Sequence, residues 1–136
     1  MISLKNYIGR SSAQYRDQVT EGQIGAFCKT LGIDDFSVAP PTFLTLFRKG
    51  EFELFQQLGL ELSRVLHTEQ EYIYENRIMA GDSIYFETTV LQVLEKARAT
   101  SFTQFITFET HFDVERDAKK VSVGKSRTSI LIREKS

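Results

Sequence analysis

The feature that most constrains the fold is a double proline followed by a long apolar run. The motif Ala39-Pro40-Pro41-Thr42-Phe43 opens a segment whose apolar residues continue as far as Leu58. Proline suits a first helical turn, because its ring fixes φ near the helical value and its missing N–H has no intrahelical partner there. The residue before each proline is driven into extended backbone. We therefore predict a rigid elbow that leads into one long, largely buried helix over residues 41–58.

Length and composition predict one soluble globular domain over residues 1–136. The chain is 41% hydrophobic and 26% charged, as in an ordinary globular protein. The net charge of -1 provides no basic face for nucleic acid or for an anionic membrane. No run reaches the length of a membrane span, and Lys5 and Arg10 interrupt the N-terminus where a signal peptide needs its apolar core. We expect a cytoplasmic protein.

The single cysteine and the two histidines do not predict a metal or redox site. Cys28 has no disulfide partner and lies among Ile24, Phe27 and Leu31, which favours a core residue over a nucleophile. The two histidines are far apart in sequence and give no metal-ligand spacing. A glycine-rich phosphate loop is also absent from the sequence. We expect neither metal nor cofactor.

An amphipathic helix is predicted upstream of the elbow. Thr20 and Gln23 have the spacing of a capping box, apolar residues follow at helical intervals, and Gly32 suits a left-handed stop. Residues 11–19 before it predict a short strand. The connection after it carries Asp34 and Asp35, which are typical of a solvated turn and are also a possible acid/base pair.

From residue 67 onward the apolar pattern alternates, which predicts four strands joined mostly by antiparallel connections. Residues 67–76 form the first, and a turn follows at Ala80-Gly81-Asp82-Ser83. The next two each place apolar residues on one parity: Ile84, Phe86, Val90 and Leu94, then Phe102, Ile106, Phe108, Phe112 and Val114. His111 has the opposite, polar parity and is expected to be exposed.

In the last predicted strand the buried parity changes. Val121 and Val123 occupy odd positions, whereas Ile130 and Ile132 occupy even ones. A strand of period two changes face only through a bulge, and we predict it at Gly124. The whole order of elements predicts an α+β hot-dog fold, an antiparallel sheet wrapped around a long central helix. The alternative is a cone-shaped sheet over N-terminal helices.

Several segments together resemble the MaoC-like hot-dog dehydratases and hydratases, in their N-terminal-half or non-catalytic-subunit type, also described as FAS1-like dehydratase domains. The elbow motif, residues 58–72 and Arg77-Ile78-Met79-Ala80-Gly81-Asp82 carry the resemblance in order and spacing. It implies reversible addition of water to a trans-2-enoyl thioester of coenzyme A or acyl carrier protein, giving a (3R)-3-hydroxyacyl thioester. The family's catalytic Asp and His belong to a D-x-N-x-x-H motif, and residues 32–39 of this chain contain neither that His nor that Asn.

Six residues are predicted to contact substrate. The amides around Thr42 and Phe43, at the predicted start of the central helix, are candidate donors to a thioester carbonyl. Phe43 and Phe47 are candidates for the wall of an acyl tunnel or for the core. His67 lies in a segment that matches the family, as a pocket residue or a structural one. The full predicted set is Pro41, Thr42, Phe43, Phe47, His67 and Gln70.

Two functions follow as hypotheses. The first is a subunit of a (3R)-3-hydroxyacyl-thioester dehydratase that lacks the catalytic dyad, shapes the acyl channel and supports a hot-dog partner carrying the motif. The second is a homodimeric acyl-thioester binder, or a thioesterase that uses Asp34, Asp35 or Glu51. Glu51 is more simply a solvated residue beside Gly50, which marks where the helix reaches water or bends.

Overall fold

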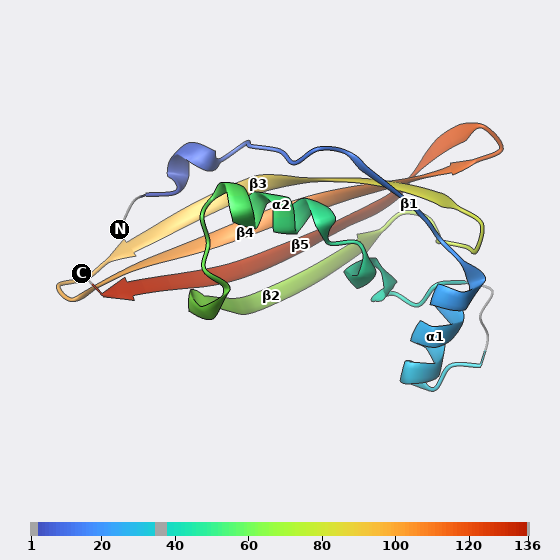
Figure 1. Ribbon diagram of the computed structural model, residues 1–136, viewed down its shortest axis with the longest axis horizontal. Helices are drawn as coiled ribbons and strands as arrows, with labels where there is room; N and C mark the ends of the chain where they lie inside the picture. Colours follow the sequence, from blue (N-terminus) through green and yellow to red (C-terminus); the bar gives the residue numbers. More distant parts are fainter. Residues whose placement is uncertain (1–2, 35–37, 136) are drawn as a thin grey trace.

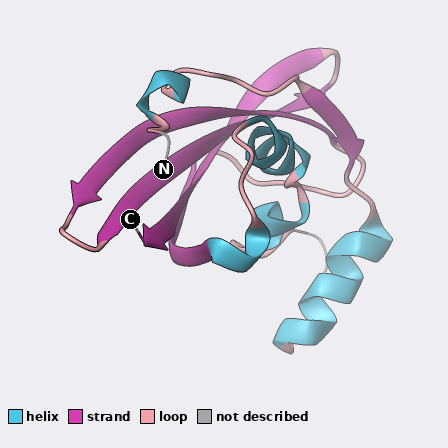
Figure 2. Cartoon of the chain, turned by 60° about the vertical axis from the view of Figure 1, so that its left-hand side comes forward, coloured by secondary structure: helices cyan, strands magenta, loops and turns pink. Residues whose placement is uncertain are grey.

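The computed structural model describes residues 3–34 and 38–135, and in them an antiparallel sheet curls around one α-helix (Figures 1 and 2). The short 3₁₀ segments are η1 to η3. The elements in chain order are η1 (Lys5–Tyr7), β1 (Tyr15–Gln18), α1 (Glu21–Leu31), η2 (Phe43–Leu46), α2 (Lys49–Gln57), η3 (Leu62–Arg64), β2 (Val65–Tyr74), β3 (Ser83–Ala97), β4 (Ser101–Arg116) and β5 (Lys119–Lys135).

The sheet has the strand order β1-β3-β4-β5-β2, and every neighbouring pair is antiparallel. The α+β class and the wrapped helix are therefore confirmed. Within the described residues, β1 and β2 form the two edges, and the second edge of β2 pairs with no strand. None of the helices in residues 3–34 and 38–135 is long and apolar enough to span a membrane.

The prediction of one continuous helix over residues 41–58 is wrong. After the single turn of η2 the chain leaves helical geometry, with Phe47 at φ -111° and ψ 77°, and α2 begins only at Lys49. The break has a packing reason: it directs the Phe47 ring into the core, with centroids 5.6 Å from Phe43 and 5.8 Å from Phe86. Burying these rings outweighs a few helical hydrogen bonds.

The predicted helix upstream of the elbow is confirmed. Thr20 Oγ1 accepts from the amide of Gln23, the Gln23 side chain accepts from the amide of Thr20, and Gly32 ends α1 at φ 72°. Cys28 is fully buried, as expected of a core residue. The strand predicted over residues 11–19 is shorter, because only β1 pairs continuously with β3.

A line of hydroxyl side chains divides the core on the inner face of the sheet, the face that packs against α2. We call Thr88, Thr110, Ser126 and Tyr72 the hydroxyl row, because they are direct cross-strand neighbours on β3, β4, β5 and β2. One hydrophobic cluster lies on the side of Phe86 and Phe112, and the other on the side of Val90 and Phe108. The two threonine hydroxyls are 2.7 Å apart, so this buried pair is hydrogen-bonded.

β-bulges set which side chains face the core, and two of them lie in the pairings of β4 with β3 and with β5. The register of β3 shifts between Val90 and Gln92, so Val93 is buried and Leu94 is 53% exposed. The inward position predicted for Leu94 is therefore wrong, because an extra residue reverses the parity. The bulge predicted at Gly124 is confirmed, since the pairing of β4 with β5 shifts at that position.

Gly124 is expected to be intolerant of any side chain. Its φ is +141°, and a Cβ there would collide with the carbonyl oxygen of Ile73 on β2. We predict that Gly124→Ala lowers the free energy of unfolding by about 3 kcal/mol, measured by chemical denaturation. Gly22→Ala is the matched control, because an added Cβ there meets only Thr20 Oγ1 at 4.0 Å. Equal stability of both variants would contradict this account.

The outer face of the sheet carries a buried carboxylate. Glu109 is only 7% exposed, and it accepts hydrogen bonds from Arg127 Nε at 2.7 Å and His111 Nε2 at 2.6 Å. Burial by itself would raise the pKa of Glu109, but these hydrogen bonds outweigh it and lower the pKa. The His111 side chain is 61% exposed, as predicted from its parity.

This cluster predicts a pH dependence of stability. A carboxyl whose pKa is lower in the folded state stabilises the fold above its unfolded pKa, and the contribution is lost as pH falls through the folded value. We expect the melting temperature of wild type to fall between roughly pH 5 and 3, and to fall less steeply in Glu109→Gln. Glu87→Gln on the same face is the control, because among the described residues Glu87 forms no hydrogen bond to an arginine. An unchanged slope in Glu109→Gln would reject the assignment.

Candidate functional site

Two tyrosines on the inner face of edge strand β2 form hydrogen bonds to the elbow and to the turn of η2 that follows it. The Tyr74 hydroxyl donates to the carbonyl of Pro41, and the Tyr72 hydroxyl is hydrogen-bonded to Thr45. Burial raises the pKa of Tyr74, so its phenol remains a donor at neutral pH. Two hollows open on either side of this attachment, and they contain the candidate site.

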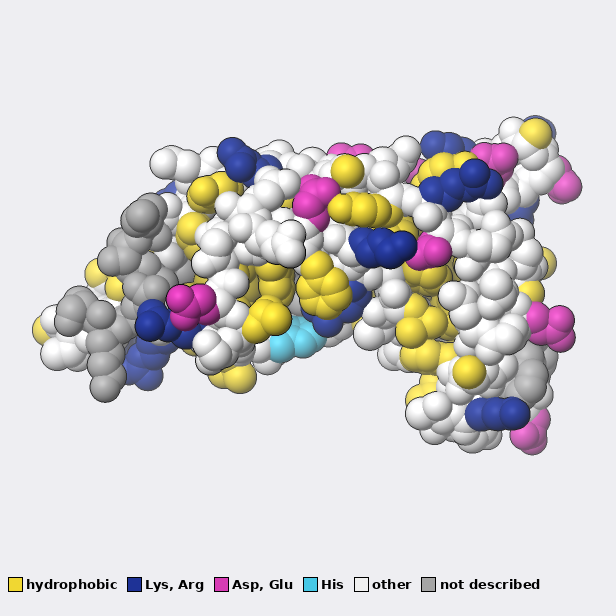
Figure 3. Space-filling view, in the orientation of Figure 1, with side chains coloured by type: hydrophobic (Ala, Val, Ile, Leu, Met, Phe, Trp, Pro, Cys, Tyr) yellow, Lys and Arg dark blue, Asp and Glu magenta, His cyan; other side chains and the backbone are white. Residues whose placement is uncertain are grey.

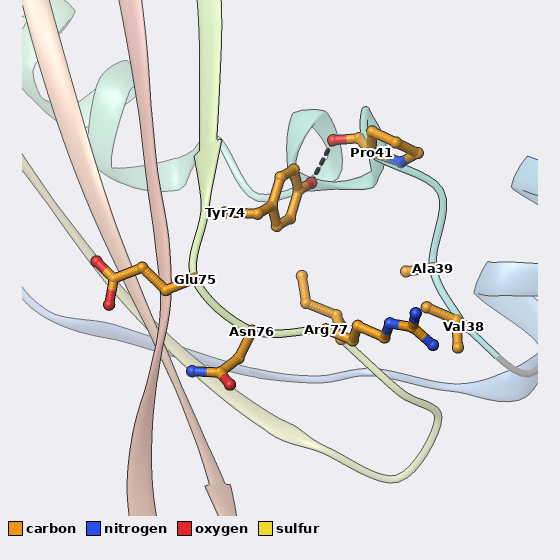
Figure 4. A pocket seen from close by; sticks show the side chains of 8 residues that line it. Val38, Ala39, Pro41, Tyr74, Glu75, Asn76 and Arg77 are labelled. Atoms are coloured by element: carbon orange, nitrogen blue, oxygen red, sulfur yellow. Dashed lines mark hydrogen bonds between the residues drawn. The ribbon is translucent and has the colours of Figure 1, made fainter.

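The larger hollow is a groove of about 550 Å³ between the elbow and the connection after β2. Figure 4 shows Tyr74 and Arg77 reaching from the β2 side toward Pro41 and Val38, whereas Glu75 points away from the space between them. The size is in the range of ligand pockets. Its complete lining is Val38, Ala39, Pro41, Tyr74, Glu75, Asn76, Arg77 and Ile78.

One wall of the groove is held by a buried ion pair. Asp82 is 4% exposed and accepts from Arg116 Nε at 2.8 Å, from Arg116 Nη2 at 2.7 Å and from the amide of Met79 at 2.8 Å. The same Arg116 Nη2 donates to the carbonyl of Arg77. These hydrogen bonds to Asp82 raise the pKa of Arg116. Asp82 thus has a structural role, because its ion pair with Arg116 positions the backbone at Arg77.

The smaller hollow is a polar cavity of about 190 Å³ beside the first turn of α2. It brings together His67 and Gln70, which are three positions apart and would face opposite sides of a regular strand. A bulge between His67 and Glu69 places both on the inner face. We call this hollow the polar cavity, and its lining is Leu44, Thr45, Arg48, Glu51, His67, Gln70, Tyr72 and Ser126.

The interpretation of Glu51 as a solvated residue is wrong. It is 4% exposed and accepts from Arg48 Nη2 at 3.1 Å and from Arg48 Nε at 3.3 Å. Gly50 is also buried, because the first turn of α2 packs so closely on Thr88 that a Cβ would collide with its hydroxyl. Sequence reasoning therefore named Glu51 as a possible catalytic carboxylate but mispredicted its burial, and it missed Arg48 as a cavity residue. The available signal was a glycine in an amphipathic helix, which is also the mark of close packing.

The remaining predicted substrate residues are separated by the fold. Pro41 lines the groove and Thr42 is exposed. Phe43 and Phe47 are 0% and 3% exposed in the aromatic core, so their role in an acyl tunnel stays a prediction. The prediction that the Thr42 and Phe43 amides begin the central helix is wrong, because α2 starts later and the Phe43 amide donates to the Pro40 carbonyl at 3.0 Å.

Two further carboxylates, Asp34 and Asp35, were predicted as candidates, and neither is among the described residues that line the two hollows. Asp34 is exposed after α1, and Asp35 lies outside the described residues.

A third hollow, of about 450 Å³, lies between α1 and η2 and is bordered by Phe27 and Leu46. Figure 3 shows hydrophobic side chains in the recess between α2 and α1.

The sequence matches a protein-family model over residues 32–119, more than half of the chain. That model is described as the FAS1-like, dehydratase domain region. The chain belongs to this family. A UPF0336 protein of Streptomyces avermitilis is 38% identical over 65 residues, which are 46% of this chain and 43% of that protein. The chain thus spans less than half the length of the curated relatives that it matches.

Solved structures confirm the predicted hot-dog fold for this member of the family. The HadBC (3R-hydroxyacyl-ACP dehydratase) complex of Mycobacterium tuberculosis is similar with a TM-score of 0.73 and 16% identity, over 92% of this chain and 96% of that one. The ChsH1–ChsH2 complex of the same organism has a TM-score of 0.65 and 17% identity, over 90% and 84%. At these identities the likeness shows the fold alone. Together with the family match, it confirms the predicted MaoC-like hot-dog family.

The tyrosine that fastens the elbow gives a direct test of this geometry. Tyr74→Phe removes the hydroxyl that donates to Pro41 and should cost about 1 kcal/mol of stability. We also expect faster amide hydrogen exchange over residues 43–47, measured by mass spectrometry. Tyr85→Phe is the control, because that hydroxyl donates to Glu115 on the outer face. Unchanged exchange in Tyr74→Phe would show that the elbow is held by other contacts.

Proposed function

We propose that this chain is a subunit of a heteromeric (3R)-3-hydroxyacyl-thioester dehydratase, and that it shapes the acyl-binding channel without supplying the catalytic Asp and His. The substrate is a thioester of coenzyme A or acyl carrier protein. The family match supports the dehydratase class. Two of the similar structures are complexes of different hot-dog chains, which supports a partner subunit.

The observation that carries the proposal is an acyl-sized groove without an imidazole. Its polar lining residues are Tyr74, Glu75, Asn76 and Arg77, so the lining contains no histidine, and the Glu75 side chain points away from the space (Figure 4). Both directions of the reaction need a general base, which removes the α-proton in dehydration and activates water in hydration. Histidine is the most common choice for this role. The sequence contains no D-x-N-x-x-H motif to provide one. A base supplied by a partner chain would complete the site.

Edge strand β2 offers the place for that partner. Its second edge is unpaired within the described residues, and its C-terminal end at Tyr74 borders the groove. An unpaired strand edge readily accepts another chain. A partner strand paired there would lie beside the groove and next to His67 and Gln70 of the polar cavity.

A homodimeric binder or thioesterase is the competing function. Its best candidate base is Glu51, which is the only one of the three proposed carboxylates that lines a hollow among the described residues. Arg48 already donates two hydrogen bonds to this carboxylate, which leaves it poorly placed to accept a proton from water. We therefore favour the heteromeric dehydratase.

The test is enoyl-thioester hydration by the chain alone and by the chain co-purified with its hot-dog partner. We expect turnover only by the pair, because the base comes from the partner. Changing the partner's motif His to Ala should abolish turnover, because that residue supplies the base. Loss of the absorbance of the conjugated thioester measures the rate.

Two outcomes would reject the proposal. Full hydration by the purified chain alone would show that it contains its own catalytic groups. Release of free thiol from acyl coenzyme A, abolished by Glu51→Gln, would establish the thioesterase instead. Glu53→Gln is the control for that variant, because Glu53 lies on the same helix and bonds Tyr15 away from the polar cavity.

A further inference from the structure

The polar cavity contains a buried hydroxyl without a hydrogen-bond partner in the described part of the chain. Ser126 is 6% exposed, lies on the inner face of β5 and lines the cavity. Its hydroxyl forms no hydrogen bond to any described residue, although every fully enclosed side-chain polar atom in the described part of the chain has a partner. The hydroxyl therefore faces the cavity space. A buried polar group in such a position is most stable when a ligand or water completes it.

Two neighbouring side chains offer further hydrogen-bonding positions. Gln70 Oε1 accepts from Thr128 Oγ1 at 2.8 Å, which leaves the Gln70 amide N–H groups as donors. His67 Nε2 is 3.0 Å from the carbonyl oxygen of Glu69. A carbonyl only accepts, so Nε2 carries the hydrogen and the neutral ring keeps Nδ1 as an acceptor. The cavity thus presents donors and an acceptor together.

The charges in the cavity cancel. Glu51 and Arg48 form an ion pair at 3.1 Å, and the lining contains no other carboxylate, lysine or arginine. A carboxylate or phosphate would meet the Glu51 charge without a free cation, so a neutral ligand is favoured. A volume of 190 Å³ is that of about six water molecules at ~30 Å³ each. A fragment of about six non-hydrogen atoms fills it.

We propose that the polar cavity binds the head of a neutral 3-hydroxyacyl thioester, with Ser126 and Gln70 donating to its oxygens and His67 Nδ1 accepting from its 3-hydroxyl. A four-carbon acyl group with two oxygens has the required size and combines an acceptor carbonyl with a hydroxyl that donates and accepts. This assignment rests on the proposed function for its substrate class. Beyond that function, it identifies residues of this chain that recognise the 3-hydroxyl.

The experiment is an NMR titration of the full chain with the N-acetylcysteamine thioester of (3R)-3-hydroxybutyrate. We expect shifts at the amides of Gln70, Tyr72 and Ser126, and a Kd raised roughly three- to tenfold in Ser126→Ala, as for loss of one neutral hydrogen bond. The butyryl thioester, which lacks the hydroxyl, should bind more weakly to wild type. Free 3-hydroxybutyrate should not bind. Ser129→Ala is the control, because that hydroxyl bonds Thr107 on the outer face.

The outcome separates this proposal from the function on which it rests. An unchanged Kd in Ser126→Ala, with the melting temperature also unchanged, overturns the cavity assignment even if the pair of subunits hydrates enoyl thioesters. Equal binding of the butyryl and 3-hydroxybutyryl thioesters overturns it as well. Selective binding that depends on Ser126 supports the assignment even if the chain alone has no turnover. Binding at the groove only, without shifts around Ser126, rejects it.

Discussion

The structure depends on the close approach of α2 to the sheet at Gly50. The glycine lies against Thr88 and Ser12 at a separation that leaves no room for a Cβ. At this approach the helix begins directly over the hydroxyl row, and Leu54 and Phe55 then cover the cluster around Val90 and Phe108. Any larger residue would lift the helix from the sheet and separate these apolar surfaces, at a cost proportional to the area exposed.

The same approach explains why the Glu51 carboxylate is buried against the inner face of the sheet. The first turn of α2 lies on hydroxyl side chains, so Glu51 and Arg48 enter a polar environment in which both charges are hydrogen-bonded. The break before α2 adds aromatic side chains to the other cluster, the one around Phe86 and Phe112. It directs Phe43 and Phe47 into an aromatic group with Phe86, which is stacked on Phe112 at 5.8 Å.

The candidate site lies where this core meets edge strand β2. Tyr72 and Tyr74 fasten the elbow to β2, so the groove and the polar cavity share one strand whose second edge is unpaired within the described residues. Because residues 1–136 contain no D-x-N-x-x-H motif and the groove lies at a strand edge, we proposed that this chain is one half of a two-chain site. Substrate recognition and proton transfer would then be divided between the chains.

Local physics made much of the fold predictable, and long-range packing decided the site. The capping box at Thr20, the alternation of the strands and the parity change at Gly124 were all readable, because each depends on neighbours in sequence. The break at Phe47, the bulge that turns Leu94 outward and the burial of Glu51 were not, because each depends on a partner far along the chain. The sequence by itself determined the fold class and most of the strands, and it shows that residues 1–136 contain no D-x-N-x-x-H motif. Only the tertiary structure joined His67, Gln70 and Ser126 around one cavity, since a bulge and two cross-strand registers were needed to bring them together.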